Sequence, residues 1–412
     1  MAAPTILLIG TADTKSDEML YLASVLESAG AIPAIMDVGV LGDPPFEPQY
    51  SKHDVAGAIG MSNQDIIDLG DENRAMVRQA AGAARLAGQL AGDNRIHGML
   101  AIGGSMATDL ALDVAEVLPL GFPKFIVSTV AFSSILPPER ISPDVMMILW
   151  AGGLYGLNSV CRTVLSQAAG AVVGACKSVE LPAQQKPLIG MTSLGKSTLK
   201  YMVRLKPEIE KRGYELAVFH TTGMGGRAME ALATKKKLAA VLDFSLIEVS
   251  NHRHGSVISA GSNRLEAAGA AGVPQIVAPG GVTLVDFRTW ADVPPRFADR
   301  EVHTHNRLIA CAKLTSEERV ESARCIAEKL MKATGPTAFI MPLQGIDEWD
   351  RKGGPFHDPA GLAAFAAEIR NRVKPPVELA EVDAHINDAA FADCALEMLD
   401  RWIADGKVTS VR

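Results

Sequence analysis

Short apolar runs alternate with amphipathic segments along the 412 residues of the chain. In the first half these runs span residues 6–9, 32–38, 99–102, 125–127 and 145–149, and in the second half 188–189, 215–219, 239–242, 275–278, 338–341 and 377–382. Apolar strands separated by helix-length connections are typical of parallel sheets, because each crossover between parallel strands needs such a connection. The pattern predicts an α/β fold with two Rossmann-like domains, each a parallel sheet flanked by helices.

The chain is too long for one ordinary core and fits two domains. The segment 180–187, which holds two prolines and two glutamines, is the best linker, so we expect domains at 1–182 and 187–412. Expected helices at 17–28 and 207–211 are followed by Gly30 and Gly213, which suit helix C-caps. The helix expected at 159–176 is rich in Gly and Ala, so it can pack closely on its own sheet or on a second subunit.

The formal net charge is −7, which excludes a broad nucleic-acid footprint because that needs a surplus of Lys and Arg. The five cysteines form no CxxC pair and indicate neither a disulfide framework nor a zinc cluster, which is typical of a reducing compartment. The N-terminus lacks a basic segment before its first apolar run, and no apolar run reaches membrane-spanning length. We therefore expect a cytoplasmic protein with no nucleic-acid and no membrane partner.

Polar, glycine-rich turns follow several expected strands of the first domain. In a parallel sheet such turns open into the ligand crevice, and the following helix directs its free N–H groups there. The first turn combines a glycine, two hydroxyls, a carboxylate and an ammonium, a set suited to phosphate with Mg²⁺, although Asp13 or Thr14 as a simple helix cap is the alternative. The predicted nucleotide-binding residues are Gly10, Thr11, Asp13, Thr14, Lys15, Gly103, Gly104, Ser105, Ser128 and Thr129.

A second glycine-rich turn, residues 220–227, lies between an expected strand and an expected helix of the second domain. Three glycines, two threonines and an arginine at a helix N-terminus indicate an anion site for a carboxylate or a phosphate. A turn that needs glycine only for its shape is the alternative. The predicted anion-binding residues are Thr221, Thr222, Gly223, Gly225, Gly226 and Arg227.

Residues 190–197 fit the P-loop pattern GxxxxGK[ST], and the apolar run that ends in Asp243 resembles the acidic partner of such a loop. The strand before the pattern is very short, and Pro207 is expected to interrupt the helix after it. The sequence leaves open whether this segment binds phosphate.

Histidines supply the candidate proton-transfer groups, because imidazole titrates near neutral pH. These are His220, His305 and His385, which lie in or near polar clusters of the second domain. His303 and His305 form an HxH pair, but no HExxH motif or cysteine ligand set accompanies it, so no metal site built from protein ligands is predicted.

Taken together, the segments resemble the Tm-one-like ATP-binding protein family, an uncharacterised family named after a plant inhibitor of tobamovirus RNA replication. The resemblance is nearly full length and rests on GTADTK (10–15), GGS (103–105), VSTVA (127–131), GLNS (156–159), VFHTTGMGGRAME (218–230), VLDF (241–244), RLEAAG (264–269), HN (305–306) and HIND (385–388). It implies a pair of Rossmann-like domains, ATP with Mg²⁺ as ligand, and a homodimer. It does not supply a reaction.

The leading hypothesis is an ATP-dependent enzyme, such as a phosphotransferase or ligase, that acts on a small acidic metabolite at a crevice between the domains. Such chemistry depends chiefly on positioning and charge neutralisation. The alternative is a nucleotide-dependent binding or regulatory protein without turnover. A dehydrogenase with a dinucleotide is a weaker third hypothesis, because no GxGxxG motif opens the chain.

Overall fold

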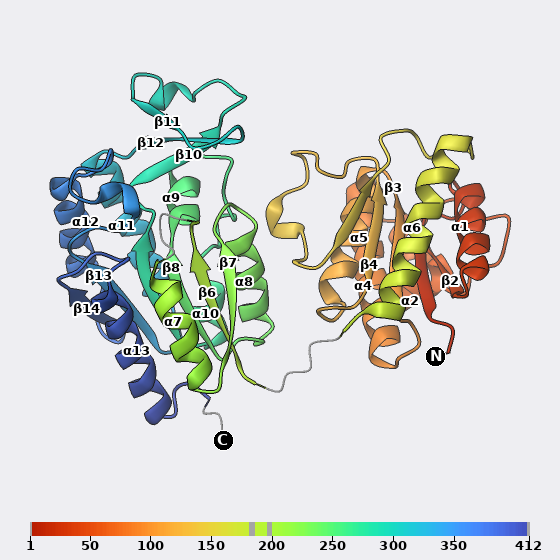
Figure 1. Ribbon diagram of the computed structural model, residues 1–412. Coiled ribbons are helices and arrows are strands. Elements are labelled where there is room, and N and C mark those ends of the chain that lie inside the picture. Colours follow the sequence, from red (N-terminus) through yellow and green to blue (C-terminus); the bar gives the residue numbers. More distant parts are fainter. Residues whose placement is uncertain (1, 181–185, 196–199, 410–412) are drawn as a thin grey trace. The chain divides into compact units, whose positions relative to one another are not determined.

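The computed structural model describes residues 2–180, 186–195 and 200–409. It divides into two compact units, Met1–Ala183 and Gln184–Arg412 (Figure 1). Each unit is built on a parallel sheet with helices on both faces, which confirms the predicted α/β fold with two Rossmann-like domains. Every apolar run in the sequence overlaps one strand of these two sheets.

The first domain has five parallel strands in the order β2-β1-β3-β4-β5. Its strands are β1 (Thr5–Gly10), β2 (Ile32–Asp37), β3 (Gly98–Gly103), β4 (Lys124–Ser128) and β5 (Met146–Leu149); its helices are α1 (Ser16–Ser28), α2 (Lys52–Ala58), α3 (Asn63–Ile67), α4 (Glu72–Gly92), α5 (Ser105–Val117) and α6 (Ser159–Ser178), with a 3₁₀ turn η1 (Pro138–Arg140). Helices α1 and α6 pack on one face of the sheet, and α2, α4 and α5 pack on the other.

Strand register brings the first domain's turns to one edge of the sheet. Gly10, the last residue of β1, lies opposite Asp37, the last residue of β2. Gly103 at the end of β3 lies opposite Ser128 at the end of β4. The strand order reverses between β1 and β3, and in open α/β sheets a ligand crevice forms outside the carboxyl ends of the strands at such a point.

The second domain repeats this arrangement with six parallel strands in the order β14-β13-β9-β8-β6-β7. Its strands are β6 (Leu188–Ser193), β7 (Glu215–His220), β8 (Ala240–Ser245), β9 (Gln275–Gly280), β13 (Thr337–Pro342) and β14 (Glu378–Val382); its helices are α7 (Lys200–Lys211), α8 (Gly225–Thr234), α9 (Ile247–Arg253), α10 (Ala267–Ala271), α11 (Ser316–Leu330), α12 (Pro359–Arg372) and α13 (Ala389–Ala404), with 3₁₀ turns η2 (Pro295–Phe297) and η3 (Glu348–Asp350). Here the strand order reverses between β6 and β8.

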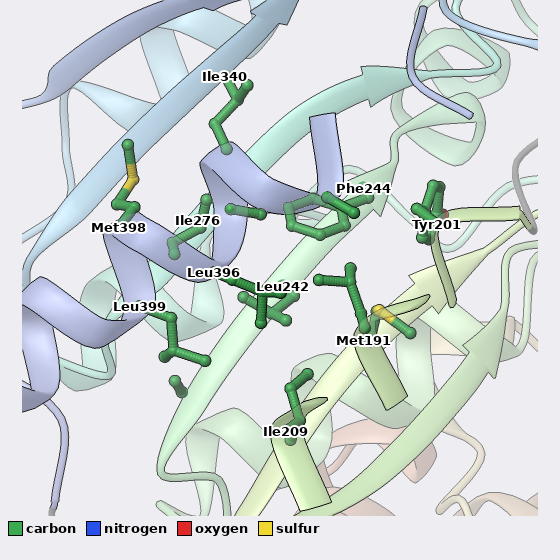
Figure 2. Close-up of a cluster of buried hydrophobic side chains, with 14 of the residues drawn as sticks. Met191, Tyr201, Ile209, Leu242, Phe244, Ile276, Ile340, Leu396, Met398 and Leu399 are labelled. Carbon is green, nitrogen blue, oxygen red and sulfur yellow. The ribbon is translucent and has the colours of Figure 1, made fainter. Parts of the chain in front are cut away.

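Two apolar layers hold the second domain together. Helices α7 and α13 cover one face of its sheet, and α9, α11 and α12 cover the other. Figure 2 shows Leu396 and Leu399 of α13 close to Leu242 of β8 and Ile276 of β9, within the cluster that α7 also joins through Ile209. Each fully buried side chain of this kind contributes about 1.5–3 kcal/mol, so the helices are fixed on the sheet that positions the turns.

Two features of the second domain differ from expectation. A three-stranded antiparallel sheet, β10 (Leu284–Arg288), β11 (Val302–Thr304) and β12 (Ile309–Lys313), follows β9, and its short strands gave no separable signal (Figure 1). The expectation that Pro207 interrupts the helix is wrong, because α7 continues through it. Pro207 lies on the exposed face, where water can satisfy the carbonyl that loses its N–H partner.

Candidate functional site

The turn that follows β1 is held in a defined shape by its own side chains. A side chain at Gly10 would crowd Met19 of α1 and Ile102 of β3, so a glycine lets the strand end close to both. The hydroxyls of Thr11 and Thr14 lie 2.8 Å apart, and the Thr14 amide donates to Asp13 Oδ1 at 2.8 Å. The alternative that Asp13 or Thr14 caps α1 is wrong, because the N-cap residue is Lys15 and no side-chain cap bond forms there.

Asp37, at the end of β2, ties this turn to the next loop. Its Oδ1 accepts the Ala12 amide at 3.0 Å and the Gly39 amide at 2.9 Å. Burial raises the pKa of Asp37, the two amides lower it, and the neighbouring carboxylate of Asp13 raises it further. A side chain built at Gly39 would lie 3.0 Å from Asp37 Oδ1 and 3.4 Å from Asp13 Oδ1, so both carboxylates face one space. Sequence reasoning missed Asp37, although its place at a strand end was a usable signal.

The turn that follows β3 presents backbone amides. Gly103 packs against Ala107 so closely that any side chain there would overlap it. The N-cap of α5 is Gly104, which has no side chain to cap the helix. The first amides of α5 therefore suit an anion. Thr129 lies beside this turn, since its amide donates to the Gly103 carbonyl at 3.2 Å.

Another predicted nucleotide residue of this edge, Ser128 at the end of β4, has a different environment. Ser128 is fully buried, and its hydroxyl lies 2.7 Å from Thr108 Oγ1 and accepts the Val130 amide at 3.0 Å. Its oxygen therefore supports the turn from behind. A direct contact between Ser128 and a ligand stays a prediction.

A pocket of about 670 Å³ opens beside the first turn. It is lined by Thr11, Asp13, Thr14, Val38, Gly39, Val40, Leu41, Ile67, Gly70, Asp71, Glu72, Ala75, Met76, Gln79, Met106, Ala107 and Leu110. Its volume is within the usual range for small-molecule sites, and apolar surface dominates its lining. Lys15 does not line it: its Nζ lies 5.7 Å from the ring centre of Tyr155, near the start of α6. The structure thus brings three of the predicted nucleotide residues to this pocket.

The glycine-rich turn of the second domain already binds an anion, which belongs to the protein itself. The amides of Gly223 and Gly226 donate to Glu248 Oε1 at 2.7 and 3.2 Å. Any side chain at Gly226 would overlap this carboxylate and Arg264. Glycine at this position is therefore required for packing around Glu248.

Arg264 completes this buried cluster. Its guanidinium donates to Glu248, Glu230 and both carboxylate oxygens of Asp243, and all four side chains are almost fully buried. Burial raises the pKa of Glu230, and Arg264 opposes that rise. One cation holds three carboxylates here, so the cluster fixes α8, α9 and the end of β8 relative to one another.

The remaining predicted anion residues are divided between the interior and the surface. Thr221 is buried, and its hydroxyl donates to the Ser193 carbonyl at 3.1 Å. Thr222 and Gly225 lie partly exposed. Arg227 is also partly exposed, and its Nη1 donates to Asn263 Oδ1 at 3.0 Å. An exogenous anion at Thr222 and Arg227 stays a prediction.

The three candidate histidines have different surroundings. His220 is exposed and its Nδ1 accepts the Gly195 amide at 3.2 Å. His305 is exposed beside Trp349, with ring centres 5.8 Å apart. His385 is buried, its Nδ1 accepts the Asn387 amide at 3.0 Å, and its Nε2 lies 2.8 Å from the Asp347 carbonyl, which together require the Nε2–H tautomer.

Strand order separates two of these histidines. His220 ends β7 and His385 follows β14, and these are the two edge strands of the sheet. At about 4.8 Å between neighbouring strands, the two strands lie roughly 24 Å apart. The structure therefore does not bring His220 and His385 together for one proton-transfer site.

The P-loop match does not have the local structure of a phosphate loop. Its first four residues, Gly190 to Ser193, belong to strand β6 instead of a turn. Asp243 accepts a hydrogen bond from the Thr192 hydroxyl at 2.7 Å, and its carboxylate also accepts hydrogen bonds from Arg264. Lys196 and Ser197 lie outside the described residues.

Three further observations bear on the type of site. Among the described residues, no group of three or more His, Cys, Asp or Glu side chains could hold a metal ion. In the same part of the chain, α6 is the one helix that is long and apolar enough to cross a membrane by length and composition, and its apolar side is buried on the sheet of the first domain. An open groove of about 840 Å³ lies between α7 and α13, and no predicted site residue lines it.

The fold and these turns define a two-domain α/β protein with polar turns at the carboxyl ends of its parallel strands. Comparison with known proteins then gives the family. The chain belongs to the uncharacterised protein family UPF0261: residues 4–181 match its N-terminal domain and residues 186–403 its C-terminal domain.

Relatives cover nearly the whole chain. A UPF0261 protein of Brucella melitensis is 57% identical over 406 residues, which cover 98% of this chain and 97% of that protein. A UPF0261 protein of Clostridium tetani is 36% identical over 390 residues, 94% of this chain and 96% of that one. The ToMV resistance protein Tm-1 of Solanum lycopersicum is 30% identical over 420 residues, 96% of this chain and 55% of the tomato protein. The resemblance to the Tm-one-like family is confirmed.

Solved structures give a weaker likeness. An S. aureus MnaA–UDP co-structure is 10% identical and has a TM-score of 0.23. The match covers 66% of this chain and 79% of the MnaA chain. A UDP-GlcNAc 2-epimerase from Methanocaldococcus jannaschii is 11% identical and has the same TM-score. The match covers 66% of this chain and 82% of the epimerase chain. Scores this low support no inference about the present chain.

Proposed function

We propose that the first domain binds ATP with Mg²⁺ in the crevice outside β1 and β3. The observation that carries this proposal is the pocket of about 670 Å³, whose mainly apolar lining includes Thr11, Asp13 and Thr14. A nucleotide needs an apolar slot for its base and a polar end for its phosphates. The uncapped start of α5 at Gly104 supports the same position, because free helix amides bind phosphate.

The donor set near the first turn fits Mg²⁺. This ion prefers oxygen ligands and is commonly held by one or two carboxylates together with substrate phosphates. Asp13 supplies the accessible carboxylate, Thr11 and Thr14 supply hydroxyls, and Asp37 holds the turn in place through the Ala12 amide. When bound, Mg²⁺ would neutralise phosphate charge.

The proposal extends to an ATP-dependent enzyme that acts on a small acidic metabolite. Arg227 and Thr222, at the partly exposed end of the second domain's glycine-rich turn, would hold the carboxylate or phosphate of that substrate. His220, in the same turn, would be the proton-transfer group, because it is exposed and His385 has both ring nitrogens engaged. We further propose a cytoplasmic homodimer.

A second candidate is a nucleotide-dependent binding or regulatory protein without turnover. The engagement of His385 inside the protein and the occupation of the Gly223 and Gly226 amides by Glu248 favour it. Incubation of the protein with Mg-ATP and a panel of small carboxylates separates the two candidates. Release of ADP or phosphate with one of them supports the enzyme, and ATP binding with no turnover on any supports the binding protein.

Titration calorimetry with Mg-ATP tests the nucleotide site. Asp13→Ala is expected to weaken ATP binding at least tenfold, because it removes the pocket carboxylate that follows β1 and is proposed to hold Mg²⁺. Asp17→Ala is the matched control, since it removes an exposed carboxylate from the first turn of α1 outside the pocket. Arg227→Ala is expected to leave ATP affinity unchanged. Equal ATP affinity in Asp13→Ala and the native protein would contradict the assignment.

A further inference from the structure

Gln79 of α4 is a buried amide in the lining of the first-domain pocket, and half of it lacks a partner. The side chain is fully buried, and its Nε2 donates to the Gly39 carbonyl at 3.0 Å. Among the described residues, nothing donates a hydrogen bond to its Oε1. The amide orientation follows from this contact, because the Gly39 carbonyl requires a donor. An unpaired carbonyl in an apolar wall is costly and is commonly paired by water or by a ligand.

The other side chains of this pocket show what kind of ligand edge fits beside Gln79. The described lining holds no Lys, Arg or His. Its charged members are Asp13, Asp71 and Glu72, whose carboxylates accept hydrogen bonds. The lining side chains thus offer mainly acceptors. They suit a ligand that presents N–H donors and disfavour one that presents a carbonyl.

We propose that this pocket holds the base of the nucleotide and that Gln79 Oε1 accepts a hydrogen bond from the base's exocyclic amino group. Adenine presents such a group, whereas guanine presents a carbonyl at the same position, so the pocket selects adenine. Apolar side chains such as Ile67, Met76 and Leu110 pack around the base. The inference rests on the proposed ATP site and names the residue that determines its base specificity.

Asn63 provides a matched control in the same domain. Its Nδ2 donates to the carbonyl of Val40, the residue next to Gly39, at 2.9 Å. Its Oδ1, like Gln79 Oε1, lacks a hydrogen-bond partner among the described residues. Asn63 is only 4% exposed but does not line the pocket. Asn63→Leu therefore removes the same kind of amide contact from the same loop without replacing a residue that lines the pocket.

The experiment measures the affinity of the full chain for ATP, GTP and purine riboside triphosphate, which lacks the exocyclic amino group. The native protein is expected to bind ATP about tenfold more tightly than purine riboside triphosphate and to bind GTP weakly, because a site that hydrogen-bonds its ligand rejects analogues without the group. Gln79→Met is expected to lower ATP affinity about tenfold and to bind ATP and purine riboside triphosphate equally. Asn63→Leu is expected to keep the native preference.

The possible outcomes separate this inference from the proposed function. Tight ATP binding with equal affinity for purine riboside triphosphate would overturn the role of Gln79 and leave the ATP site intact; a buried water on Oε1 would give this result. An unchanged ATP preference in folded Gln79→Met would also overturn it. Absence of ATP binding would overturn both. If Gln79→Met does not fold, the affinities of the native protein for ATP and purine riboside triphosphate still test the inference, because this comparison needs no variant.

Discussion

Asp286 of β10 is a buried carboxyl whose replacement by asparagine is expected to stabilise the second domain. Burial raises its pKa from 3.8 to about 6, although the amide of Asn251 donates to its Oδ2 at 3.2 Å and opposes the rise. One pKa unit corresponds to about 1.36 kcal/mol. The ionised side chain therefore lowers the free energy of unfolding by about 3 kcal/mol at neutral pH, and Asp286→Asn removes that cost while it keeps an oxygen for Asn251.

The gain depends on pH in a defined direction. Because the folded state holds the proton of Asp286 more tightly than the unfolded chain, the native protein loses stability as the pH rises. The loss begins near pH 4, the ordinary pKa of the unfolded carboxyl, and is complete above the folded value of about 6. Asp286→Asn is thus expected to match the native protein near pH 4 and to exceed it by about 2–3 kcal/mol at pH 8.

Fluorescence-monitored urea unfolding at pH 4 and pH 8 measures this difference. Three of the four tryptophans, Trp290, Trp349 and Trp402, lie in the second domain, so the signal reports mainly on it. Asp393→Asn is the control, because Asp393 is a partly exposed carboxylate paired with Arg204 and its removal is expected to change stability by less than about 1 kcal/mol. A gain in Asp286→Asn that is equal at both pH values, or a loss that grows with pH, would refute the reasoning.

Two further predictions concern the buried cluster and the proposed dimer. Arg264→Met is expected to lower the free energy of unfolding of the second domain by about 3–5 kcal/mol at pH 7, because it leaves three buried carboxylates without their cation. The loss should shrink at pH 5 in the same urea assay, because burial raises the pKa of Glu230 and the loss of Arg264 removes the charge that opposes this rise; native-like stability at both pH values would contradict it. Gly174→Glu is expected to leave the fold intact, because a side chain there meets no atom within 4 Å, and to convert the proposed homodimer to monomer in sedimentation velocity. Unchanged sedimentation would reject this face of α6 as the dimer contact.

The sequence predicted the strands well because a parallel strand carries its signal locally. A strand such as β3 is buried on both faces and appears as an uninterrupted apolar run. Strand β11 has three residues, none of them fully buried, so the same criterion had nothing to detect. The turns at Gly10 and Gly103 were found for a similar reason, since each follows directly on such a run.

Sequence patterns did not show which distant residues contact each other in the folded chain. Residues 220–227 indicated an anion site, but nothing local showed that Glu248, two elements later, supplies the anion. Arg264 opened the segment RLEAAG without any sign that it joins Glu230 and Asp243 from separate elements. Gln79 gave no signal, because one glutamine in an Ala-rich helix looks like any solvent-facing residue.

The two domains share a strand order yet differ in what occupies their turns, and this difference supports the first domain as the nucleotide site. In the second domain the amides of Gly223 and Gly226 are already paired with Glu248, and Arg264 closes the space behind that carboxylate. A phosphate that bound these two amides would have to displace a buried, hydrogen-bonded charge, which is strongly unfavourable. In the first domain Asp37 pairs with one amide of the turn, that of Ala12, and Asp13 lines an open pocket. We infer that an accessible carboxylate beside an open pocket, which the first domain has in Asp13, makes this domain the better candidate for binding a triphosphate.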